Sequence, residues 1–306
     1  MSKINFYKDI FLFGNNTSNI NNNQQDTHTK QKGLETHHTW LISAHQIETI
    51  AWFLNLLAKS EKLETFKGQR IGYYQIRLKD DLKIDVFITR FPLASVEEKF
   101  LSFPQKLGTK FNRTILMLDW EHDNKFKWGS DMIKENKIKY ATILMCNVSH
   151  AKYLERNKVE WNTQKMDFIN QFIRLVALKN QVSLVYSLSL NNLDSLLELL
   201  LEKDSHNHND PTVENFIDLD RLCILKGQDS ISKIQMMDET FPVNDSLTDI
   251  VENRYEQIIP NENGELLKPG DISYVSEVRN KNIDENDDCR SVEDLLAFLY
   301  KEQKQK

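Results

Sequence analysis

The stretch that decides the fold is Met166-Asp167-Phe168-Ile169-Asn170-Gln171-Phe172-Ile173-Arg174, followed by Ser183-Leu184-Val185-Tyr186-Ser187 and Asn192-Leu193-Asp194. It predicts a long helix from about 162 to 179, then a buried strand, then the start of another helix. Apolar residues cover most of the circumference of the long helix. We therefore expect it to pack against a sheet, and its width leaves open that one edge meets a partner.

Outward from this stretch, short apolar runs alternate with helical patterns. The runs at 40–43, 114–118, 141–146 and 219–225 predict buried strands, and 72–78 and 84–88 predict two strands joined by a polar turn. Segments 47–57, 126–136 and 193–202 have helical spacing. This alternation predicts a doubly wound α/β domain over residues 39–240, with a mostly parallel sheet covered on both faces.

Two polar regions flank this domain. Residues 1–38 combine a short apolar anchor at 4–12 with an Asn-rich run that we expect to be disordered, because it has too little apolar surface to bury. Residues 241–306 are acidic and weakly patterned, which predicts an extended tail.

The tail ends in a predicted amphipathic helix at 291–303. Ser291 is a suitable N-cap with Asp294 three residues later, and Lys301 and Lys304 lie near the end, where they complement the helix dipole. An apolar stripe beyond a polar linker favours a helix that folds into the groove of a partner, although it could also dock on its own domain. The stripe consists of Val292, Leu295, Leu296, Phe298 and Leu299.

Composition excludes several classes of function. The net charge of −6 argues against a nucleic-acid surface, which needs a basic stripe. No apolar run approaches the roughly 18 residues of a membrane-spanning helix, so no membrane insertion is expected. Three widely spaced cysteines and a first segment without a signal-peptide core favour a cytoplasmic location.

The first strand-to-helix turn is where a doubly wound domain would bind phosphate. That chemistry needs glycines whose amides face the phosphates, and a lysine. The turn here has neither, and Glu48 adds negative charge. No Asp-x-x-Gly follows the middle strands, and Asn147 is the one residue left of an Asn-Lys-x-Asp base reader. We therefore expect no nucleotide cofactor and a degenerate phosphate loop at Ser43, Ala44, His45, Gln46, Glu48 and Thr49.

Other candidate sites have plainer interpretations. The histidine pairs at 37–38 and at 206 and 208 match no zinc spacing, so we interpret them as linker and loop and expect no metal. Asp119-Trp120-Glu121-His122-Asp123 follows a predicted strand, which is a catalytic location in α/β enzymes. We interpret it as a surface loop in which Trp120 docks a partner, with an enzyme using Asp119, Glu121 and His122 as the alternative.

Several segments occur in an order that resembles the light intermediate chain family of cytoplasmic dynein, and the similarity extends over about 39–240. The length and the Asn-rich leader resemble yeast-type members. The segments are Phe6-Tyr7-Lys8-Asp9-Ile10, Gly72-Tyr73-Tyr74, Leu116-Met117-Leu118-Asp119-Trp120 with Trp128, Asp167-Phe168-Ile169 to Arg174, Ser183 to Ser187, and Asp220, Ile224, Gly227, Asp229, Ser230, Lys233 and Ile234.

The resemblance implies a Ras-like domain carried on the tail of the dynein heavy chain. It also implies a C-terminal helix that engages a coiled-coil adaptor or cortical anchor, and two copies in each motor dimer on microtubules. Candidate heavy-chain contacts are Trp120, Trp128, Phe168 and Phe172. The chain departs from the family in its missing phosphate loop and in Gln228, where the family prefers tryptophan. We expect a non-catalytic dynein subunit; the alternative is a small GTPase-like regulator with an atypical phosphate loop.

Overall fold

The computed structural model describes residues 37–58, 71–77, 82–106, 108–135, 139–186, 193–201 and 222–261. Most of the predicted leader, the histidines at 206 and 208, and the predicted helix at 291–303 lie outside these residues. Within the described ranges, no helix is long and apolar enough to cross a membrane.

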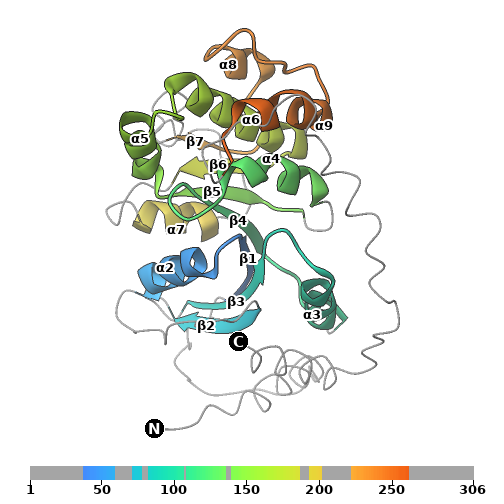
Figure 1. Cartoon of the computed structure of the whole chain (residues 1–306). Coiled ribbons are helices and arrows are strands. Elements are labelled where there is room, and N and C mark those ends of the chain that lie inside the picture. Colours follow the sequence, from blue (N-terminus) through green and yellow to red (C-terminus); the bar gives the residue numbers. More distant parts are fainter. Residues whose placement is uncertain are drawn as a thin grey trace, which may run out of the picture.

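A seven-stranded sheet forms the centre of the molecule (Figure 1). The strand order is β2-β3-β1-β4-β5-β6-β7, in which the five inner strands run parallel and the two edge strands pair antiparallel. This confirms the predicted α/β class and the mostly parallel sheet. The strands are β1 His37–Ala44, β2 Gly72–Arg77, β3 Lys83–Arg90, β4 Arg113–Asp119, β5 Thr142–Cys146, β6 Ser183–Tyr186 and β7 Cys223–Ile224.

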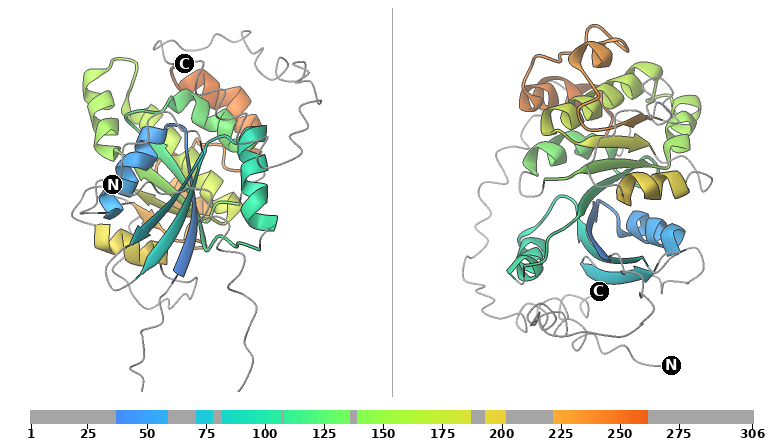
Figure 2. Two further views of the ribbon diagram at one scale, coloured as in Figure 1. Left: turned by 90° about the horizontal axis from the view of Figure 1, so that it is seen from below. Right: turned by 180° about the vertical axis from the view of Figure 1, so that it is seen from behind.

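Helices cover both faces of the sheet, as Figure 2 shows from two further sides. Alternate residues of each inner strand point to opposite faces. Ile115 and Met117 of β4 pack with α2 and α7, whereas Leu116 and Leu118 pack with α4 and α6. The helices are α2 Ile47–Ala58, α3 Ser95–Lys106, α4 Lys125–Lys134, α5 Val148–Asn157, α6 Thr163–Asn180, α7 Leu193–Leu201, α8 Ile231–Gln235, α9 Leu247–Ile250, the π-helix η3 Val251–Tyr255 and α10 Glu256–Ile258.

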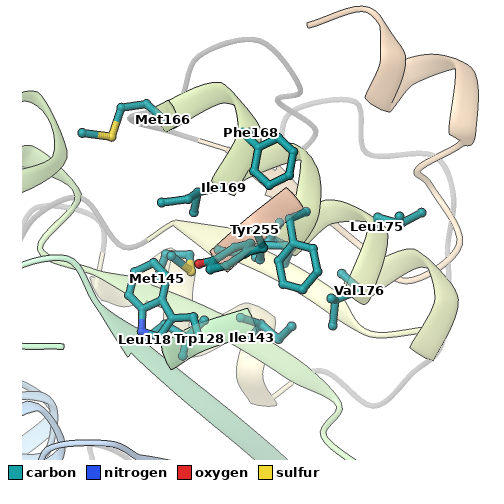
Figure 3. Close-up of a cluster of buried hydrophobic side chains, with 14 of the residues drawn as sticks. Leu118, Trp128, Ile143, Met145, Met166, Phe168, Ile169, Leu175, Val176 and Tyr255 are labelled. Atoms are coloured by element: carbon teal, nitrogen blue, oxygen red, sulfur yellow. The ribbon is translucent and has the colours of Figure 1, made fainter. Parts of the chain in front are cut away.

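The long helix α6 lies inside the molecule. Asn162 caps its first turn by accepting a hydrogen bond from the Lys165 amide, and Gln181 ends it in the left-handed conformation. One face packs on the sheet. The other is covered by residues 231–259, which we call the strap (Figure 3). The rings of Phe168 and Phe172 lie 5.2 and 4.8 Å from those of strap residues Phe241 and Tyr255. The chain itself therefore covers the second apolar face, for which a partner had remained an option.

The prediction that residues 241–306 form an extended tail is wrong for 241–259. This part of the strap is helical and packs on α4 and α6. Its helices α9, η3 and α10 follow one another without a break, but the π-helical turns of η3 interrupt the 3.6-residue period, so the sequence shows no regular helical spacing there. The buried side chains of 241–259 are Phe241, Val243, Ile250, Val251, Tyr255 and Ile259.

Buried polar side chains of α6 fasten the strap and the turn that precedes it. The Gln171 amide donates to the carbonyl oxygens of Ile234 and Asp238 at 2.8 and 3.0 Å. Arg174 Nε and Nη2 donate to the two carboxylate oxygens of Asp229 at 2.9 and 2.8 Å. Both partners are buried, and a bidentate pair of this kind fixes geometry as well as adding energy.

Candidate functional site

The carboxyl ends of β1, β4 and β5 meet at one edge of the sheet, where a doubly wound fold places its ligands. Only His45 and Gln46 separate the end of β1 from the start of α2. Ser43 and Ala44 belong to the strand, and Glu48 and Thr49 to the helix. A phosphate loop needs several more residues to wrap around its ligand. The first turn is therefore too short as well as lacking glycine.

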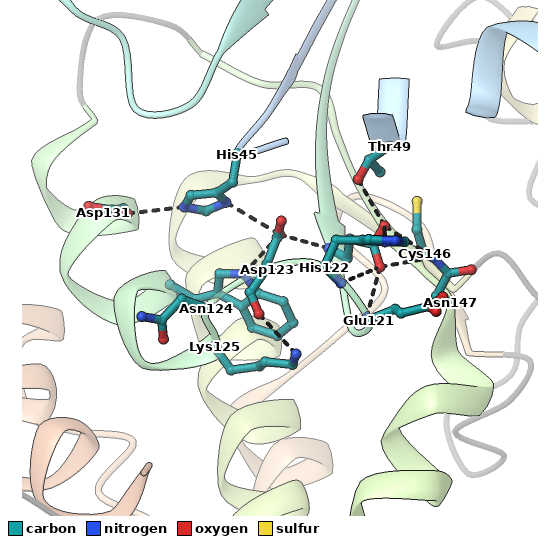
Figure 4. Close-up of polar contacts among 12 residues, drawn as sticks. His45, Thr49, Glu121, His122, Asp123, Asn124, Lys125, Asp131, Cys146 and Asn147 are labelled. Atoms are coloured by element: carbon teal, nitrogen blue, oxygen red, sulfur yellow. Dashed lines mark hydrogen bonds and ion pairs between the residues drawn. The ribbon is translucent and has the colours of Figure 1, made fainter. Parts of the chain in front are cut away.

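Asp119, the last residue of β4, connects several elements at this edge; Figure 4 shows its partners Thr49, His122 and Asn147. Its buried carboxylate accepts hydrogen bonds from Thr49 Oγ1 at 2.8 Å and from Asn147 Nδ2 at 2.9 Å. It also accepts from the backbone amides of Glu121 and His122, and lies 3.0 Å from His122 Nδ1. Burial by itself would raise the pKa of Asp119, but the hydrogen bonds from Asn147, Glu121, Thr49 and His122 outweigh it and lower the pKa. Asp119 is therefore ionised at neutral pH, and the hydrogen-bond donors around it are engaged by its carboxylate.

Asn147 adopts the left-handed conformation, with φ of 51°. This places its side-chain amide on Asp119, which lies on the neighbouring strand. Asn147 is thus the turn residue between β5 and α5, and its side chain bonds this turn to β4.

His45 lies on the other side of the edge. Its Nε2 is 3.0 Å from Asp131 Oδ2 in α4, and its Nδ1 is 3.4 Å from Asp123 Oδ2. Burial would lower the pKa of His45, but the close contacts with Asp123 and Asp131 and their negative charges raise it to about 9. At neutral pH the ring is therefore a cation between two carboxylates. The ring edge also contacts Phe91, at a centroid distance of 4.9 Å.

Asp123 links the two halves of this network. Its Oδ2 accepts from the Asp119 backbone amide at 2.8 Å and from Trp128 Nε1 at 3.1 Å. The ammonium group of Lys125 donates to the Asp123 carbonyl at 2.9 Å, and burial lowers the pKa of Lys125. Side chains from β4, α2, α4 and the β5–α5 turn are joined through these bonds.

This arrangement does not fit the phosphates of a nucleotide. The edge presents buried carboxylates where a phosphate would need amide and lysine donors, and the hydroxyl of Thr49 already donates to Asp119. No group of three or more histidine, cysteine, aspartate or glutamate side chains in the described part of the chain is arranged to hold a metal ion.

The alternative enzyme site is partly assembled. Asp119 contacts the half-exposed ring of His122, whereas Glu121 is exposed and contributes its backbone amide. The thiol of Cys146 on the next strand is fully buried, and burial raises its pKa well above the usual value. It therefore stays protonated and is a poor nucleophile. The Asp119–His122 pair is consistent with a structural contact that closes the turn.

The candidate heavy-chain contacts are wrong, because all four side chains lie in the core. Trp120, Trp128, Phe168 and Phe172 are at most 9% exposed, and the rings of Trp120 and Trp128 pack edge to face at 5.2 Å. A sequence does not distinguish a buried tryptophan at a strand end from an exposed one. Trp52 on α2 is 40% exposed and is the tryptophan that reaches the surface.

The predicted adaptor-binding residues Val292, Leu295, Leu296, Phe298 and Leu299 lie outside the described residues, so the terminal helix stays a prediction.

The chain is similar to curated yeast proteins over most of its length, although no protein-family model matches it. It is 24% identical to the cytoplasmic dynein intermediate light chain DYN3 of Kluyveromyces lactis over 62% of this chain and 55% of that protein, so it spans little more than half of that relative. It is also 24% identical to the DYN3 protein of Eremothecium gossypii, over 80% of this chain and 69% of that protein. The identity to the DYN3 protein of Saccharomyces cerevisiae is again 24%, over 81% of this chain and 82% of that protein.

The fold matches a solved structure as well. The crystal structure of the conserved domain of the dynein light intermediate chain aligns with a TM-score of 0.50 and 17% identity, over 76% of this chain and 96% of that one. That match shows a shared fold, a mixed and mostly parallel α/β sheet. Taken with the three relatives, it shows that the chain is similar to the cytoplasmic dynein light intermediate chain family in both sequence and fold.

Proposed function

We propose that the chain is a non-catalytic subunit of the cytoplasmic dynein motor. Its α/β body is a Ras-like domain whose nucleotide edge has become structural, and it serves as a docking platform for the heavy-chain tail. The main support for this proposal is the set of hydrogen bonds that Asp119 accepts from Thr49, Asn147 and the Glu121 amide. They fill the ligand edge of the fold with the protein's own side chains. The similarity to dynein light intermediate chains supports the cytoplasmic dynein motor as the assembly to which such a platform belongs.

The outer face of α2 supports a heavy-chain contact. Glu48, Trp52 and Asn55 lie at i, i+4 and i+7 and are exposed. The inner face, with Phe53 and Leu54, packs on the sheet, so the helix is held rigidly from behind. An exposed tryptophan on a rigid helix is a typical interface hot spot.

The C-terminal helix has the second role. Its stripe of leucines beyond an acidic linker is suited to a groove on a coiled-coil adaptor or cortical anchor. Replacing Leu295 and Leu296 with aspartate should abolish adaptor capture and leave motor assembly intact. Unchanged capture of the adaptor by this variant would remove the role given to the helix.

Affinity purification of the full chain from its source cell tests the motor assignment. We expect mass spectrometry to identify a cytoplasmic dynein heavy chain among the co-purifying proteins. Trp52→Ala should lower its recovery about thirtyfold, as expected for a hot spot of about 2 kcal/mol. Met236→Ala is the matched control, because Met236 is also exposed but lies beside α8. Absence of a heavy chain from the wild-type sample would refute the proposal.

A further inference from the structure

Helix α8 exposes two large apolar side chains at the outer end of the molecule. Ile231 is 44% exposed, and Met236, which follows the last residue of the helix, is 81% exposed. The other side of α8 is fixed, because Ile234 is buried and its carbonyl oxygen accepts a hydrogen bond from the Gln171 amide of α6. In Figure 1 and in the right view of Figure 2 this helix lies at the top. Exposed apolar side chains on a firmly held helix mark a docking surface.

Charged side chains lie at both ends of this helix. Lys226 precedes α8 and is exposed, and the Lys233 ammonium lies at the same end, because it donates to the Gln228 carbonyl oxygen at 2.8 Å. Asp238 and Glu239 follow the helix and are exposed. Along the chain, the order is therefore cation, apolar surface, acid. We call Lys226, Ile231, Met236, Asp238 and Glu239 the α8 face.

The charges of the α8 face have no counter-charge on the body of the protein. In the part of the chain that the structure describes, Lys226, Asp238 and Glu239 form no ion pair. Asp238 accepts hydrogen bonds from the amide and the hydroxyl of Thr240 at 2.8 and 2.7 Å, and these neutral donors leave its negative charge in place. A matching partner has acids at one end of an apolar stripe and cations at the other.

We propose that the α8 face binds the predicted terminal helix of the same chain, residues 291–304. When the two helices run in the same direction, the acids of the terminal helix meet Lys226, its leucines cover the apolar side chains of α8, and its lysines meet Asp238 and Glu239. A helix this short is marginal in water, so it needs an apolar surface on which to fold. In chain order, the acids, leucines and lysines are Glu293, Asp294, Leu295, Leu296, Leu299, Lys301 and Lys304.

The chain that joins the two partners is long enough. Residues 262–290, a stretch of 29, separate the last described residue from Ser291, and such a length reaches up to about 100 Å. A segment tethered in this way has an effective concentration of about 1 mM, so weak contacts are sufficient for docking within one chain.

Docking on α8 hides the leucine stripe from other proteins. The same leucines are the proposed ligand of the adaptor, so the apparent affinity for the adaptor falls with the docked fraction. Met236→Asp should therefore release the helix and increase adaptor capture. This regulatory consequence rests on the proposed function of the terminal helix, whereas the docking itself does not.

Disulfide trapping in the full chain tests the docking, because Cys289 lies just before the terminal helix. Ser232→Cys places a second thiol at an exposed position in the first turn of α8. A Cys223→Ala background removes the partly exposed native cysteine and leaves the buried Cys146. Oxidised glutathione serves as the oxidant. Lys106→Cys in the same background is the control, because it is exposed at the end of α3, near the other end of the molecule from α8 in Figure 1.

We expect the intramolecular disulfide between positions 232 and 289 to form at least about tenfold faster than that between 106 and 289, since docking raises the local concentration. High salt should reduce the difference, because part of the contact is ionic. Adding Met236→Asp should return trapping at 232 to the control rate without loss of stability in urea, because Met236 is exposed. Equal rates at 232 and 106, trapping that Met236→Asp leaves unchanged, or disulfide-linked dimers in place of the intramolecular bond would overturn the proposal.

Charge reversal tests the direction of the docked helix. Lys301→Glu together with Lys304→Glu should slow trapping at 232, because the new carboxylates face the acids that follow α8. Adding Glu239→Lys should recover part of the rate. Failure to recover would refute the parallel arrangement on which the proposal rests.

These experiments separate the two proposals. If trapping at 232 succeeds while the chain with Leu295→Asp and Leu296→Asp still captures an adaptor, the docking stands and the role of the helix as adaptor ligand fails. If trapping fails while that variant loses adaptor capture, the function stands and the docking on α8 is refuted.

Discussion

The buried imidazolium of His45 should make the stability of this protein depend on pH above 6.5. The folded pKa of about 9 exceeds the unfolded value of 6.5, so the protonated ring stabilises the folded state. Its contribution is complete below pH 6.5 and is lost as the pH rises through 9. A difference of about 2.5 units corresponds to about 3 kcal/mol, because each unit is worth about 1.4 kcal/mol.

Urea denaturation of the wild type and of His45→Gln, from pH 6 to pH 10, measures this contribution. The wild type should lose about 3 kcal/mol of unfolding free energy relative to the variant between pH 6.5 and pH 9.5. His150→Gln is the control. Burial lowers the pKa of His150, so its titration affects stability below pH 6.5 and leaves the slope above that pH unchanged.

Nuclear magnetic resonance measures the pKa of His45 directly. The ring proton of His45 should titrate near pH 9, because Asp123 and Asp131 hold the proton on the ring. A midpoint at or below 6.5, or parallel stability curves for the wild type and His45→Gln, would refute the account of the His45 ion pairs.

Three further substitutions test the packing and the edge network. Arg174→Met removes the cation that pairs with the buried Asp229 carboxylate and should cost about 3–5 kcal/mol by urea denaturation; the double variant with Asp229→Leu should recover much of that loss. Gly129→Ala places a Cβ 2.9 Å from the Tyr255 ring and should push η3 away from α4. The variant should lose about 1–3 kcal/mol of unfolding free energy and show faster hydrogen exchange in the strap. Unchanged exchange would contradict this packing. The pKa of Asp119 is lower in the folded state than in the unfolded chain, so protonation of Asp119 destabilises the fold at acid pH. Below pH 3.8 the wild type should therefore lose stability more steeply than Asp119→Asn. Equal slopes would show that Asp119 is not held as an anion.

The sequence was sufficient for the central sheet and the long helix. The runs at 114–118 and 141–146 are apolar throughout because both sides of β4 and β5 are covered, and this pattern survives in any single sequence. Helix α3 was missed because its pattern is polar and includes Pro104, and α5 because its exposed face is charged. The strap was missed because α8 is only five residues long and because the π-helix η3 interrupts the helical period of the continuous run at 247–258.

The site shows where prediction from sequence stops. The absence of a phosphate loop could be recognised from sequence, because that loop is defined by residue types within one short segment. The bonds that replace it join residues far apart in the chain: Thr49 and Asp119 are separated by 70 positions, and His45 and Asp131 by 86. No local pattern encodes such pairs. The same limit explains why Trp120 and Trp128 were assigned to the surface although both are buried.

Calorimetric titration of the full chain with GTP and magnesium tests the central claim most directly, because the claim is that the chain's own side chains occupy the ligand edge. We predict no binding heat beyond dilution, for GTP and for GDP alike. Micromolar binding of either nucleotide, abolished by a substitution at His45 or Thr49, would contradict it and restore the alternative of a GTPase-like regulator.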